Sequence, residues 1–553
     1  MFTRHHAVWP KGLSHHLTFP QTSLYANLEV SAQRYPDKPA VIFYGRTLSY
    51  AQLQREVDAL AGFLQQRCGV QRGDRVLLLM QNAPQFIVAY YAVLRADAMV
   101  VPINPMNLAP EVQNYLRDSG ARTVICGQEL YPQVRPSLGK EAQHVIVATY
   151  ADYVDAQTDL KLPDSAKLAR EAISDAGACA WHEALALKLQ PDLHRAVPDD
   201  LCVMPYTSGT TGQPKGCVHT HASVMMTAVA GVRWTAAAAD NVVLAGLPFF
   251  QVTRMQGCMN GPIFAGSTIV VMQRWDRDTA AELIQRYRVT SWTNISTMAI
   301  DFLANPNLGK YDLSSLATIG GGGAAMPEAV AQRLIEHTGL HYIEGYGLSE
   351  TMAPTHINPS ERPKKQCLGI PIFDTDVRVV EPETLRELGP NETGEIISSG
   401  PQILREYWGK PEASAEALIS YDSKRFFRTG DLGYYDQEGY FFLVDRLKRM
   451  INAAGYKVWP AEVETRLYAH PAVQEACVIS ALDEYRGETV KAIVVLREAS
   501  RGQVMPEQII EWARSQMAAY KVPRVIEFRD SLPKSPTGKV QWRQLQEQEA
   551  QRT

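Results

Sequence analysis

The chain has 553 residues, of which 46% are hydrophobic and 21% are charged, and its formal net charge is −4. This length is too great for one hydrophobic core, so we expect at least two domains. The charge excludes a strongly basic nucleic-acid-binding chain, and no apolar run of about 18 residues predicts an integral membrane segment. Residues 1–13 lack the apolar centre of a signal peptide, and the eight cysteines form no CxxC pair. We therefore expect a cytoplasmic protein.

Helical and extended patterns alternate over the first half of the chain. Ser49 precedes an apolar stripe at helical spacing, which predicts a capped helix that buries Leu53, Val57, Leu60 and Leu64. Residues 86–93 show the same spacing. Short apolar runs predict strands at 76–80, 100–103, 123–126 and 145–148. Strands that alternate with helices at these distances predict a parallel sheet in an α/β domain.

The second half of the chain ends in a smaller predicted unit, which begins near residue 450. Pro460 suits the first turn of a helix, and residues 476–479 and 492–496 are predicted strands. Ile509, Ala513 and Met517 line a last predicted helix. These elements indicate a small α+β domain of roughly 100 residues. Residues 150–198 are polar with weak periodicity, and we expect them to form a variable surface segment.

The most informative segment is Tyr206–Gly216, with the sequence YTSGTTGQPKG. It follows the apolar run 201–204, so we expect it to leave a strand. Its glycines let backbone N–H groups approach a phosphate, its hydroxyl groups can donate to phosphate oxygens, and Lys215 adds a positive charge. No GxxxxGK here is followed by Ser or Thr, which disfavours a P-loop NTPase. On its own, such a loop is equally consistent with a flexible surface turn.

Six segments in order resemble the motifs of the adenylate-forming superfamily, which contains acyl-CoA synthetases, adenylation domains and firefly luciferase. They lie within residues 25–545, and six matches in the family's order exclude coincidence. The resemblance implies a large N-terminal domain of parallel-sheet α/β layers (1–446) and a small mobile α+β C-terminal domain (447–553), with a hinge near Lys448. The six segments are 206–216, 323–327, 345–351, 428–432, 445–448 and 533–539.

The resemblance also assigns roles to single residues, most of which would otherwise be surface or packing residues. Glu350 and Thr207 are expected to hold Mg²⁺ on ATP, because Mg²⁺ prefers oxygen ligands. Lys539 is expected to bridge the substrate carboxylate and the α-phosphate, and Asp431 to accept the ribose hydroxyls. The residues expected to bind ATP or CoA are Thr207, Ser208, Gly209, Thr210, Thr211, Gly212, Lys215, Gly323, Ala324, Ala325, Glu344, Gly345, Tyr346, Gly347, Ser349, Asp431, Arg446, Lys448, Gly455, Tyr456 and Lys457.

The walls of the expected acid pocket depart from the family's pattern. Gln251 stands where the family often has histidine, and residues 292–297 replace a Val-Pro-Pro-like stretch. Arg254 is expected at the surface, although it could pair with a second anionic group on the substrate. Gly322, Gly345 and Gly347 could leave room for an aliphatic chain, which favours a medium- or long-chain fatty acid over an aryl or short-chain acid. The residues expected to bind the acid are Phe250, Gln251, Met255, Asn294, Gly322 and Gly347.

Four histidines near the N-terminus occur in two pairs, His5/His6 and His15/His16, and we expect them to be solvated. Two more histidines, His219 and His221, follow the hydroxyl-rich loop. We expect these two to serve in capping or packing rather than as metal ligands.

Together these motifs imply an ATP-dependent acid–CoA ligase of fatty acid metabolism. Its partners would be ATP, Mg²⁺, CoA and a small carboxylic acid, and a homodimer is compatible with the sequence. One alternative is an adenylation enzyme that loads an amino acid on a carrier protein, but residues 247–268 contain no acidic partner for an ammonium group. Transfer of another acid to a carrier stays open. A non-catalytic nucleotide sensor is disfavoured by the combination of Glu350, Asp431 and Lys539.

Overall fold

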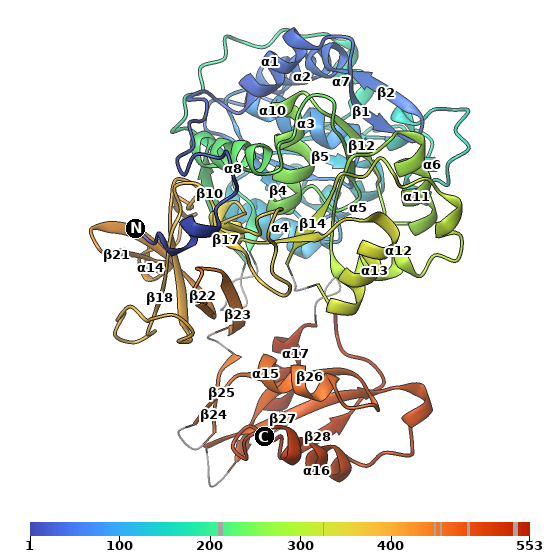
Figure 1. Ribbon diagram of the computed structural model, residues 1–553. Helices are drawn as coiled ribbons and strands as arrows, with labels where there is room; N and C mark the ends of the chain where they lie inside the picture. The colour runs from blue at the N-terminus through green and yellow to red at the C-terminus, as the bar shows by residue number, and fades with distance from the viewer. Residues whose placement is uncertain are drawn as a thin grey trace. The chain divides into compact units, whose positions relative to one another are not determined.

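The computed structural model describes residues 1–207, 214–323, 326–446, 449–453, 456–483, 487–534 and 540–552 (Figure 1). For Arg446, Asn452, Tyr456 and Lys457 it describes the backbone alone. The chain divides into two compact units. The larger unit comprises residues 1–377, 398–427 and 438–440, and the smaller comprises 378–397, 428–437 and 441–553. Residues 378–397 and 428–437 thus group with the C-terminal segment, whereas the motifs placed a single boundary at residue 446.

The first sheet of the larger unit has nine strands within the described ranges, in the order β17-β16-β15-β14-β13-β11-β12-β1-β2. Its central strands are parallel, and β2, β16 and β17 are antiparallel additions. The carboxyl ends of β11, β13, β14 and β15 therefore share one edge. The bounds are β1 (Pro39–Phe43), β2 (Arg46–Ser49), β11 (Val242–Ala245), β12 (Thr268–Val271), β13 (Ser291–Asn294), β14 (Thr318–Gly322), β15 (Tyr342–Tyr346), β16 (His356–Ile357) and β17 (Ile370–Pro371).

The second sheet, also nine-stranded in the part of the chain described, has the order β20-β10-β8-β4-β3-β5-β6-β7, with β9 beside β10. Strands β3 to β8 run parallel, which confirms the predicted parallel sheet, and β10 is antiparallel to its neighbours. The bounds are β3 (Arg75–Leu79), β4 (Met99–Pro102), β5 (Thr123–Gly127), β6 (His144–Ala148), β7 (Ala178–Ala180), β8 (Leu201–Val203), β9 (Tyr206–Thr207), β10 (Lys215–Thr220) and β20 (Glu406–Tyr407).

Helix α3 (Pro84–Arg95) lies between the two sheets, because it packs against β1 of the first sheet and β3 and β4 of the second (Figure 1). Every residue from Pro84 to Leu94 is buried, as expected for a helix that is apolar all round. Its neighbour α2 (Tyr50–Gln66) has the predicted cap. The Ser49 Oγ accepts from the Gln52 backbone N–H at 3.2 Å, and the Gln52 side chain accepts from the Ser49 N–H at 2.8 Å.

The larger unit contains twelve further α-helices in its described ranges. Their bounds are α1 (Tyr25–Arg34), α4 (Ala109–Ser119), α5 (Tyr131–Val134), α6 (Asp164–Lys167), α7 (Trp181–Ala186), α8 (His221–Trp234), α9 (Val252–Met255), α10 (Gly261–Ala265), α11 (Arg277–Arg286), α12 (Ser296–Leu303), α13 (Glu328–Thr338) and α14 (Pro411–Ala417).

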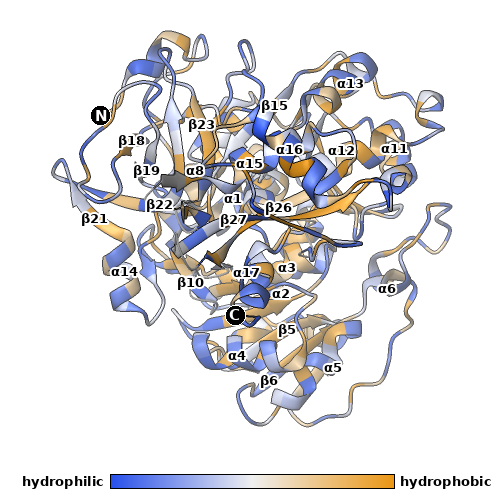
Figure 2. Ribbon diagram, turned by 90° about the horizontal axis from the view of Figure 1, so that it is seen from below, coloured by the Kyte–Doolittle hydropathy of each residue, from blue (hydrophilic) through white to orange (hydrophobic). Residues whose placement is uncertain are grey.

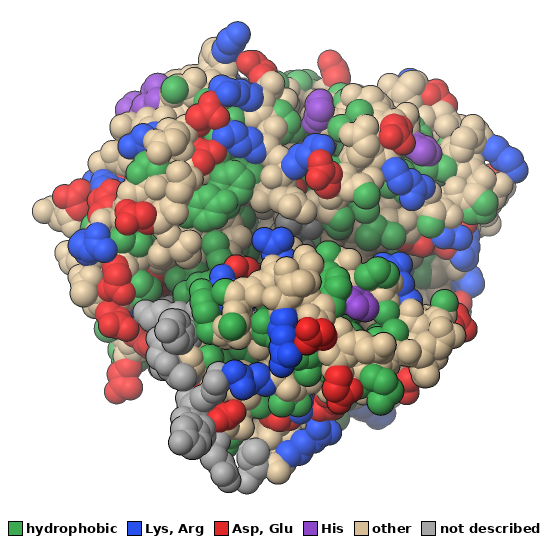
Figure 3. Space-filling view, turned by 60° about the horizontal axis from the view of Figure 1, so that its bottom comes forward, with side chains coloured by type: hydrophobic (Ala, Val, Ile, Leu, Met, Phe, Trp, Pro, Cys, Tyr) green, Lys and Arg blue, Asp and Glu red, His purple; other side chains and the backbone are tan. Residues whose placement is uncertain are grey.

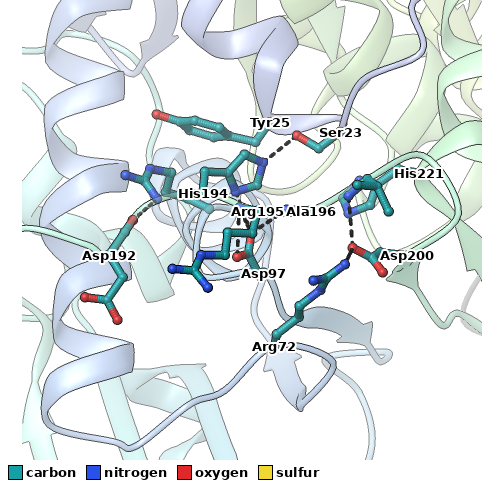
Figure 4. A network of polar contacts seen from close by, with 12 residues as sticks. Ser23, Tyr25, Arg72, Asp97, Asp192, His194, Arg195, Ala196, Asp200 and His221 are labelled. Atoms are coloured by element: carbon teal, nitrogen blue, oxygen red, sulfur yellow. Dashed lines mark hydrogen bonds and ion pairs between the residues drawn. The ribbon is translucent and has the colours of Figure 1, made fainter.

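The segment 150–198 is more ordered than its composition predicts. It contributes strand β7 to the second sheet, and Trp181 is buried. Its end is anchored by His194, whose Nδ1 lies 2.6 Å from the Asp97 carboxylate and whose Nε2 lies 2.6 Å from the Ser23 hydroxyl (Figure 4). Burial acts to raise the pKa of Asp97, but the contacts from His194 and two backbone N–H groups outweigh it and lower the pKa. The prediction of a surface segment is therefore wrong for these parts.

The N-terminal residues also pack against the larger unit. His5 is buried, and its ring stacks on Phe2 with centroids 5.5 Å apart. The Phe2 backbone N–H donates to Asp376 at 2.8 Å, and His16 lies 2.6 Å from the Asp374 carboxylate. Burial lowers the pKa of His5 to about 3. The expectation of four solvated histidines is therefore wrong for His5.

The smaller unit contains most of the third sheet and all of the fourth. The third sheet has the order β18-β19-β22-β21, with β23 beside β22, and the limits of the two units fall within β18, β19 and β22. The fourth has the order β25-β24-β27-β26, with β28 beside β27. The bounds are β18 (Asp376–Val380), β19 (Gly394–Ser399), β21 (Leu418–Tyr421), β22 (Lys424–Tyr435), β23 (Phe441–Arg446), β24 (Ile451–Ala453), β25 (Tyr456–Val458), β26 (Val473–Asp483), β27 (Gly487–Leu496) and β28 (Val525–Phe528).

Three helices pack with the fourth sheet, whose strands β26 and β27 consist largely of hydrophobic residues (Figure 2). Helix α15 (Pro460–Tyr468) begins with proline as predicted, and α16 (Pro506–Gln516) matches the predicted last helix. A further helix, α17 (Trp542–Ala550), follows it. The sequence did not predict α17 because Leu545 is its one buried residue.

The surface of the molecule carries both signs of charge. On the face drawn in Figure 3, Lys and Arg side chains are interspersed with Asp and Glu side chains. Across the described ranges, no helix has both the length and the apolar character of a membrane span.

Candidate active site

The two ends of the hydroxyl-rich loop lie side by side. Strand β9 pairs antiparallel with β10, and Thr207 stands opposite Lys215 in their register. The loop residues Ser208, Gly209, Thr210, Thr211 and Gly212 lie outside the described residues. The Thr207 hydroxyl and the Lys215 ammonium therefore belong to neighbouring positions on two paired strands.

Glu350 lies in a 3₁₀ turn, Ser349–Thr351, that follows β15 at the carboxyl edge of the first sheet. Its side chain is 9% exposed, and its backbone carbonyl accepts from the Leu404 N–H at 2.7 Å. The His219 Nε2 donates to the Ser349 carbonyl at 2.7 Å. Burial lowers the pKa of His219 to about 4, so this imidazole is neutral at pH 7. His219 thus has the packing role that was predicted, and it fixes the turn that carries Glu350.

Tyr407 is a site residue that the motifs did not predict. Its hydroxyl donates to the Glu350 Oε1 at 2.9 Å, and the Lys215 Nζ lies 4.9 Å from the centroid of its ring. Strand β20 brings it there by pairing with β10 opposite Cys217. Burial and then the Glu350 carboxylate raise the pKa of Tyr407, so its hydroxyl remains a donor. The structure therefore brings Lys215 and Glu350 together around one tyrosine, and Thr207 stands opposite Lys215 on the paired strand.

The oxygen atoms in this cluster are suitable ligands for Mg²⁺. The ion is normally bound by one or two carboxylates together with substrate phosphates and water. Glu350 supplies a carboxylate that is already fixed by a hydrogen bond, and Thr207 supplies a hydroxyl group. In the described ranges, no group of three or more His, Cys, Asp or Glu side chains forms a separate metal site.

The predicted adenine-binding turn begins at Gly323, whose φ of 96° favours glycine. Ala324 and Ala325 lie outside the described residues. Just beyond them, the Met326 N–H donates to the Glu344 carboxylate at 3.4 Å, and the Gln366 N–H donates to it at 3.2 Å. Burial raises the pKa of Glu344 to about 7, and these two bonds act against that rise. Glu344 therefore holds Met326, which follows this turn, and also the separate segment at Gln366.

The glycines expected to leave room for an aliphatic chain are filled by backbone instead. A Cβ on Gly322 would lie 2.2 Å from the Gly345 carbonyl oxygen, and one on Gly347 would lie 2.8 Å from the Ala353 Cα. A Cβ on Gly345 would lie 3.3 Å from the His356 carbonyl oxygen. The expectation that these three glycines leave room for an aliphatic chain is therefore wrong. Contact of Gly322 and Gly347 with the acid stays a prediction, as does contact of Gly345, Gly347, Tyr346 and Ser349 with ATP.

The segment that carries Phe250 and Gln251 follows β11 at the same sheet edge. Asn82 holds it, because its amide donates to the Leu247 carbonyl at 2.8 Å and accepts from the Phe249 N–H at 2.8 Å. Gln251 occupies the N-terminal cap position of α9 without a side-chain capping bond, and a π-helical turn (Gln256–Asn260) continues from that helix. Such turns are common at functional sites.

Two predicted pocket residues, Met255 in α9 and Asn294 at the end of β13, are fully buried. Arg254 in α9 is 7% exposed, so the expectation that it lies at the surface is wrong. Neither the periodicity nor the composition of so short a helix indicates that its arginine is buried.

In the smaller unit, Asp431 in β22 stands opposite Arg446 in β23. Asp431 is 1% exposed, and its backbone N–H donates to the Thr429 hydroxyl at 3.0 Å. The preceding Arg428 pairs with Glu395, whose other carboxylate oxygen accepts from the Gly430 N–H at 3.2 Å. The predicted ribose motif is thus a fixed turn. Lys448, Gly455 and Lys539 lie outside the described residues, and the side chains of Arg446, Tyr456 and Lys457 are not described.

The family model described as "AMP-binding enzyme" matches residues 28–408, and the one described as "AMP-binding enzyme C-terminal domain" matches residues 462–539. The chain belongs to the AMP-binding enzyme family, whose members form adenylates. It is 36% identical to a long-chain-fatty-acid–CoA ligase of Bacillus subtilis (strain 168), over 99% of this chain and 98% of that protein.

The chain is also similar to a second curated relative and to a solved structure. A feruloyl-CoA synthase of Amycolatopsis sp is 33% identical over 92% of this chain and 95% of that protein. Among solved structures, ATP-bound MatB from Rhodopseudomonas palustris superposes with a TM-score of 0.84 at 26% identity, over 96% of this chain and 99% of that one. The names of the relatives thus include a fatty acid in one case and the aryl acid ferulate in another.

Proposed function

We propose that this chain joins a carboxylic acid to CoA through an acyl-adenylate, while ATP is converted to AMP and pyrophosphate. The observation that carries the proposal is the cluster of Glu350, Tyr407, Lys215 and Thr207. It combines a fixed carboxylate for Mg²⁺ with a cation and a hydroxyl group at the two ends of a loop rich in phosphate-binding residues. Family membership over nearly the whole chain supports the same reaction.

The residues of the cluster have distinct tasks in the first step. Mg²⁺ offsets negative charge on the phosphates of ATP when it is bound. Glu350 would hold the ion, Tyr407 keeps the Glu350 carboxylate in one orientation, and Lys215 and Thr207 would bind phosphate oxygens. In-line attack by the carboxylate on the α-phosphorus forms the acyl–phosphate bond and releases pyrophosphate. The thiol of CoA then attacks the acyl carbon, and AMP leaves.

The other predicted residues would act on ATP, on CoA and between the two steps. Asp431 would accept the ribose hydroxyls, and Lys539 would offset the repulsion between the carboxylate and the α-phosphate. The small domain would turn at Lys448 between the steps and bring the Gly455 loop to the CoA thiol. These assignments rest on the motifs alone, since Lys448, Gly455 and Lys539 are outside the described residues.

The acid is proposed to carry a medium or long hydrocarbon chain, as the names of several relatives indicate for those proteins. An aryl or short-chain acid is the alternative, because a feruloyl-CoA synthase is also among the relatives. A carrier protein in place of CoA is the second alternative. We further propose a cytoplasmic location, with which eight unpaired cysteines agree. A homodimer is tested by light scattering on the purified chain.

The test is product analysis with the purified protein, ATP, Mg²⁺, CoA and a panel of acids of different chain length. We expect AMP, pyrophosphate and the CoA thioester in equal amounts, with the highest kcat/KM for an acid with an extended apolar chain. Formation of ADP, or the absence of AMP with every acid, would contradict the proposal. Transfer to a carrier protein but not to CoA would favour the second alternative.

A further inference from the structure

Arg254 is a buried cation without a counter-ion. Its side chain is 7% exposed, and its Nε has no hydrogen-bond partner. Within the described residues, the guanidinium group forms neither an ion pair nor a hydrogen bond. Leaving a buried charge unpaired costs several kcal/mol. A partner from outside the chain would remove this cost.

The surroundings of Arg254 offer polar groups but no anion. The titratable groups that act on it electrostatically are the Cys258 thiol and the Tyr342 hydroxyl. Burial raises the pKa of Cys258 to about 11, and burial followed by the Glu344 charge raises the pKa of Tyr342. Both groups are therefore neutral at pH 7. Among the described residues, no anion compensates the positive charge of Arg254.

The same sheet edge contains a second buried polar group without a partner. Asn294, the last residue of β13, is fully buried, and neither atom of its amide has a hydrogen-bond partner. Tyr342 interacts electrostatically with Arg254, and its hydroxyl donates to the backbone carbonyl of Asn294 at 3.1 Å. An unsatisfied buried amide costs about 1–3 kcal/mol. Both orphaned groups belong to segments that the sequence assigns to the acid pocket.

We propose that Arg254 binds a second carboxylate of the acid substrate, so that the enzyme activates dicarboxylic acids in which an apolar segment separates the two carboxylates. This inference rests on the proposed acid–CoA ligase function and names its substrate class. A guanidinium group binds a carboxylate through two parallel hydrogen bonds, and the pairing is strong where water is excluded. The first carboxylate reacts with ATP, and the second one selects the substrate.

The test compares monocarboxylic and dicarboxylic acids of equal carbon number by AMP formation. The wild-type enzyme should prefer the dicarboxylic acid. Arg254→Met should lower kcat/KM for that acid by about 10²-fold or more, the effect of removing one partner of a buried charge pair. The kcat/KM for the monocarboxylic acid and the KM for ATP should change little. Arg117→Met is the matched control, because Arg117 is exposed and pairs with Glu141.

A binding measurement gives a readout that does not depend on turnover. Dicarboxylic acid alone should raise the melting temperature of the wild-type protein and leave that of Arg254→Met unchanged. If Arg254→Met does not fold, the proposal is tested with Arg254→Lys and with the thermal shift of the wild-type protein. The inference is overturned if the wild type shows no preference and no thermal shift, or if Arg254→Met loses activity on both acids equally. The absence of AMP with every acid would instead overturn the proposed function.

Discussion

At the scale of single residues, Tyr407 contacts both the Glu350 carboxylate and the Lys215 ammonium, one through its hydroxyl and the other through its ring. The hydrogen bond holds one oxygen of Glu350, and the face of the ring attracts the cation. Tyr407 therefore positions two groups that are predicted to bind the phosphates of ATP and their metal ion. Its contribution is to orientation, because it touches Glu350 rather than a reacting atom.

Replacing Tyr407 by Phe removes the hydroxyl and keeps the ring. We expect adenylation to fall about 10-fold, since a hydrogen bond to a charged group contributes about 1.5–3 kcal/mol. The measurement is pyrophosphate release in a single turnover. The Tyr131→Phe variant is the matched control, because Tyr131 donates to Asp175 at 2.7 Å away from the cluster.

A double-mutant cycle tests whether Tyr407 acts through Glu350. Glu350→Gln alone should lower adenylation by about 10²-fold. Adding Tyr407→Phe to Glu350→Gln should cause little further loss. Independent losses that multiply would show that Tyr407 does not act by positioning Glu350.

Glu344 should make the stability of the protein depend on pH. Burial raises its folded pKa to about 7, above the ordinary value of 4.5. The unfolded chain therefore loses the proton first, and Glu344 destabilises the fold increasingly as pH rises from about 4.5 to about 7. Glu344→Gln should remove this penalty, which is about 3 kcal/mol.

The comparison of melting temperatures at pH 5 and pH 8 measures that penalty. Glu344→Gln should be more stable than the wild type at pH 8, and the difference should be smaller at pH 5. A variant that is less stable than the wild type by the same amount at both pH values would contradict the raised pKa.

At the scale of elements, the sheet edge that presents Glu350 depends on close packing between strands. A Cβ on Gly321 would lie 1.9 Å from the Asn294 carbonyl oxygen across β14 and β13. No side chain fits there unless the strands separate. The glycines of β14 are thus required by strand pairing, not by space for a ligand.

Gly321→Ala should therefore destabilise the fold by about 1–3 kcal/mol, the usual cost of overpacking a core. Thermal unfolding of the purified variant measures the effect. Gly309→Ala is the matched control, because a Cβ at Gly309 meets nothing within 4 Å. Equal melting temperatures for the two variants would contradict the close approach of β13 and β14.

Local patterns predicted elements well where burial is complete and failed where it is partial. The apolar runs at β3 to β6 and the Ser49 cap were identified because a fully buried strand and a capped helix have clear sequence signals. Strand β7 and helix α17 lack such signals, since few of their residues are buried. The family motifs were visible in the sequence, but the position of Tyr407 depends on the pairing of β20 with β10, and the burial of Arg254 depends on tertiary packing. No local pattern indicates either of these.

At the scale of the whole molecule, the chain combines a larger unit that carries Glu350 with a smaller unit that carries Asp431. The motifs predict contacts with ATP in both units. The two family models match residues 28–408 and 462–539, so residues of both units belong to matched segments.

The central claim is that an acyl-adenylate precedes the thioester. A single turnover with ATP, Mg²⁺ and acid, without CoA, measures it directly by quenched-flow and mass spectrometry. We expect up to one acyl-adenylate and one pyrophosphate per enzyme molecule, and conversion of that adenylate to thioester and AMP when CoA is added. Thioester formation without a detectable adenylate, or release of ADP in place of AMP, would contradict the account.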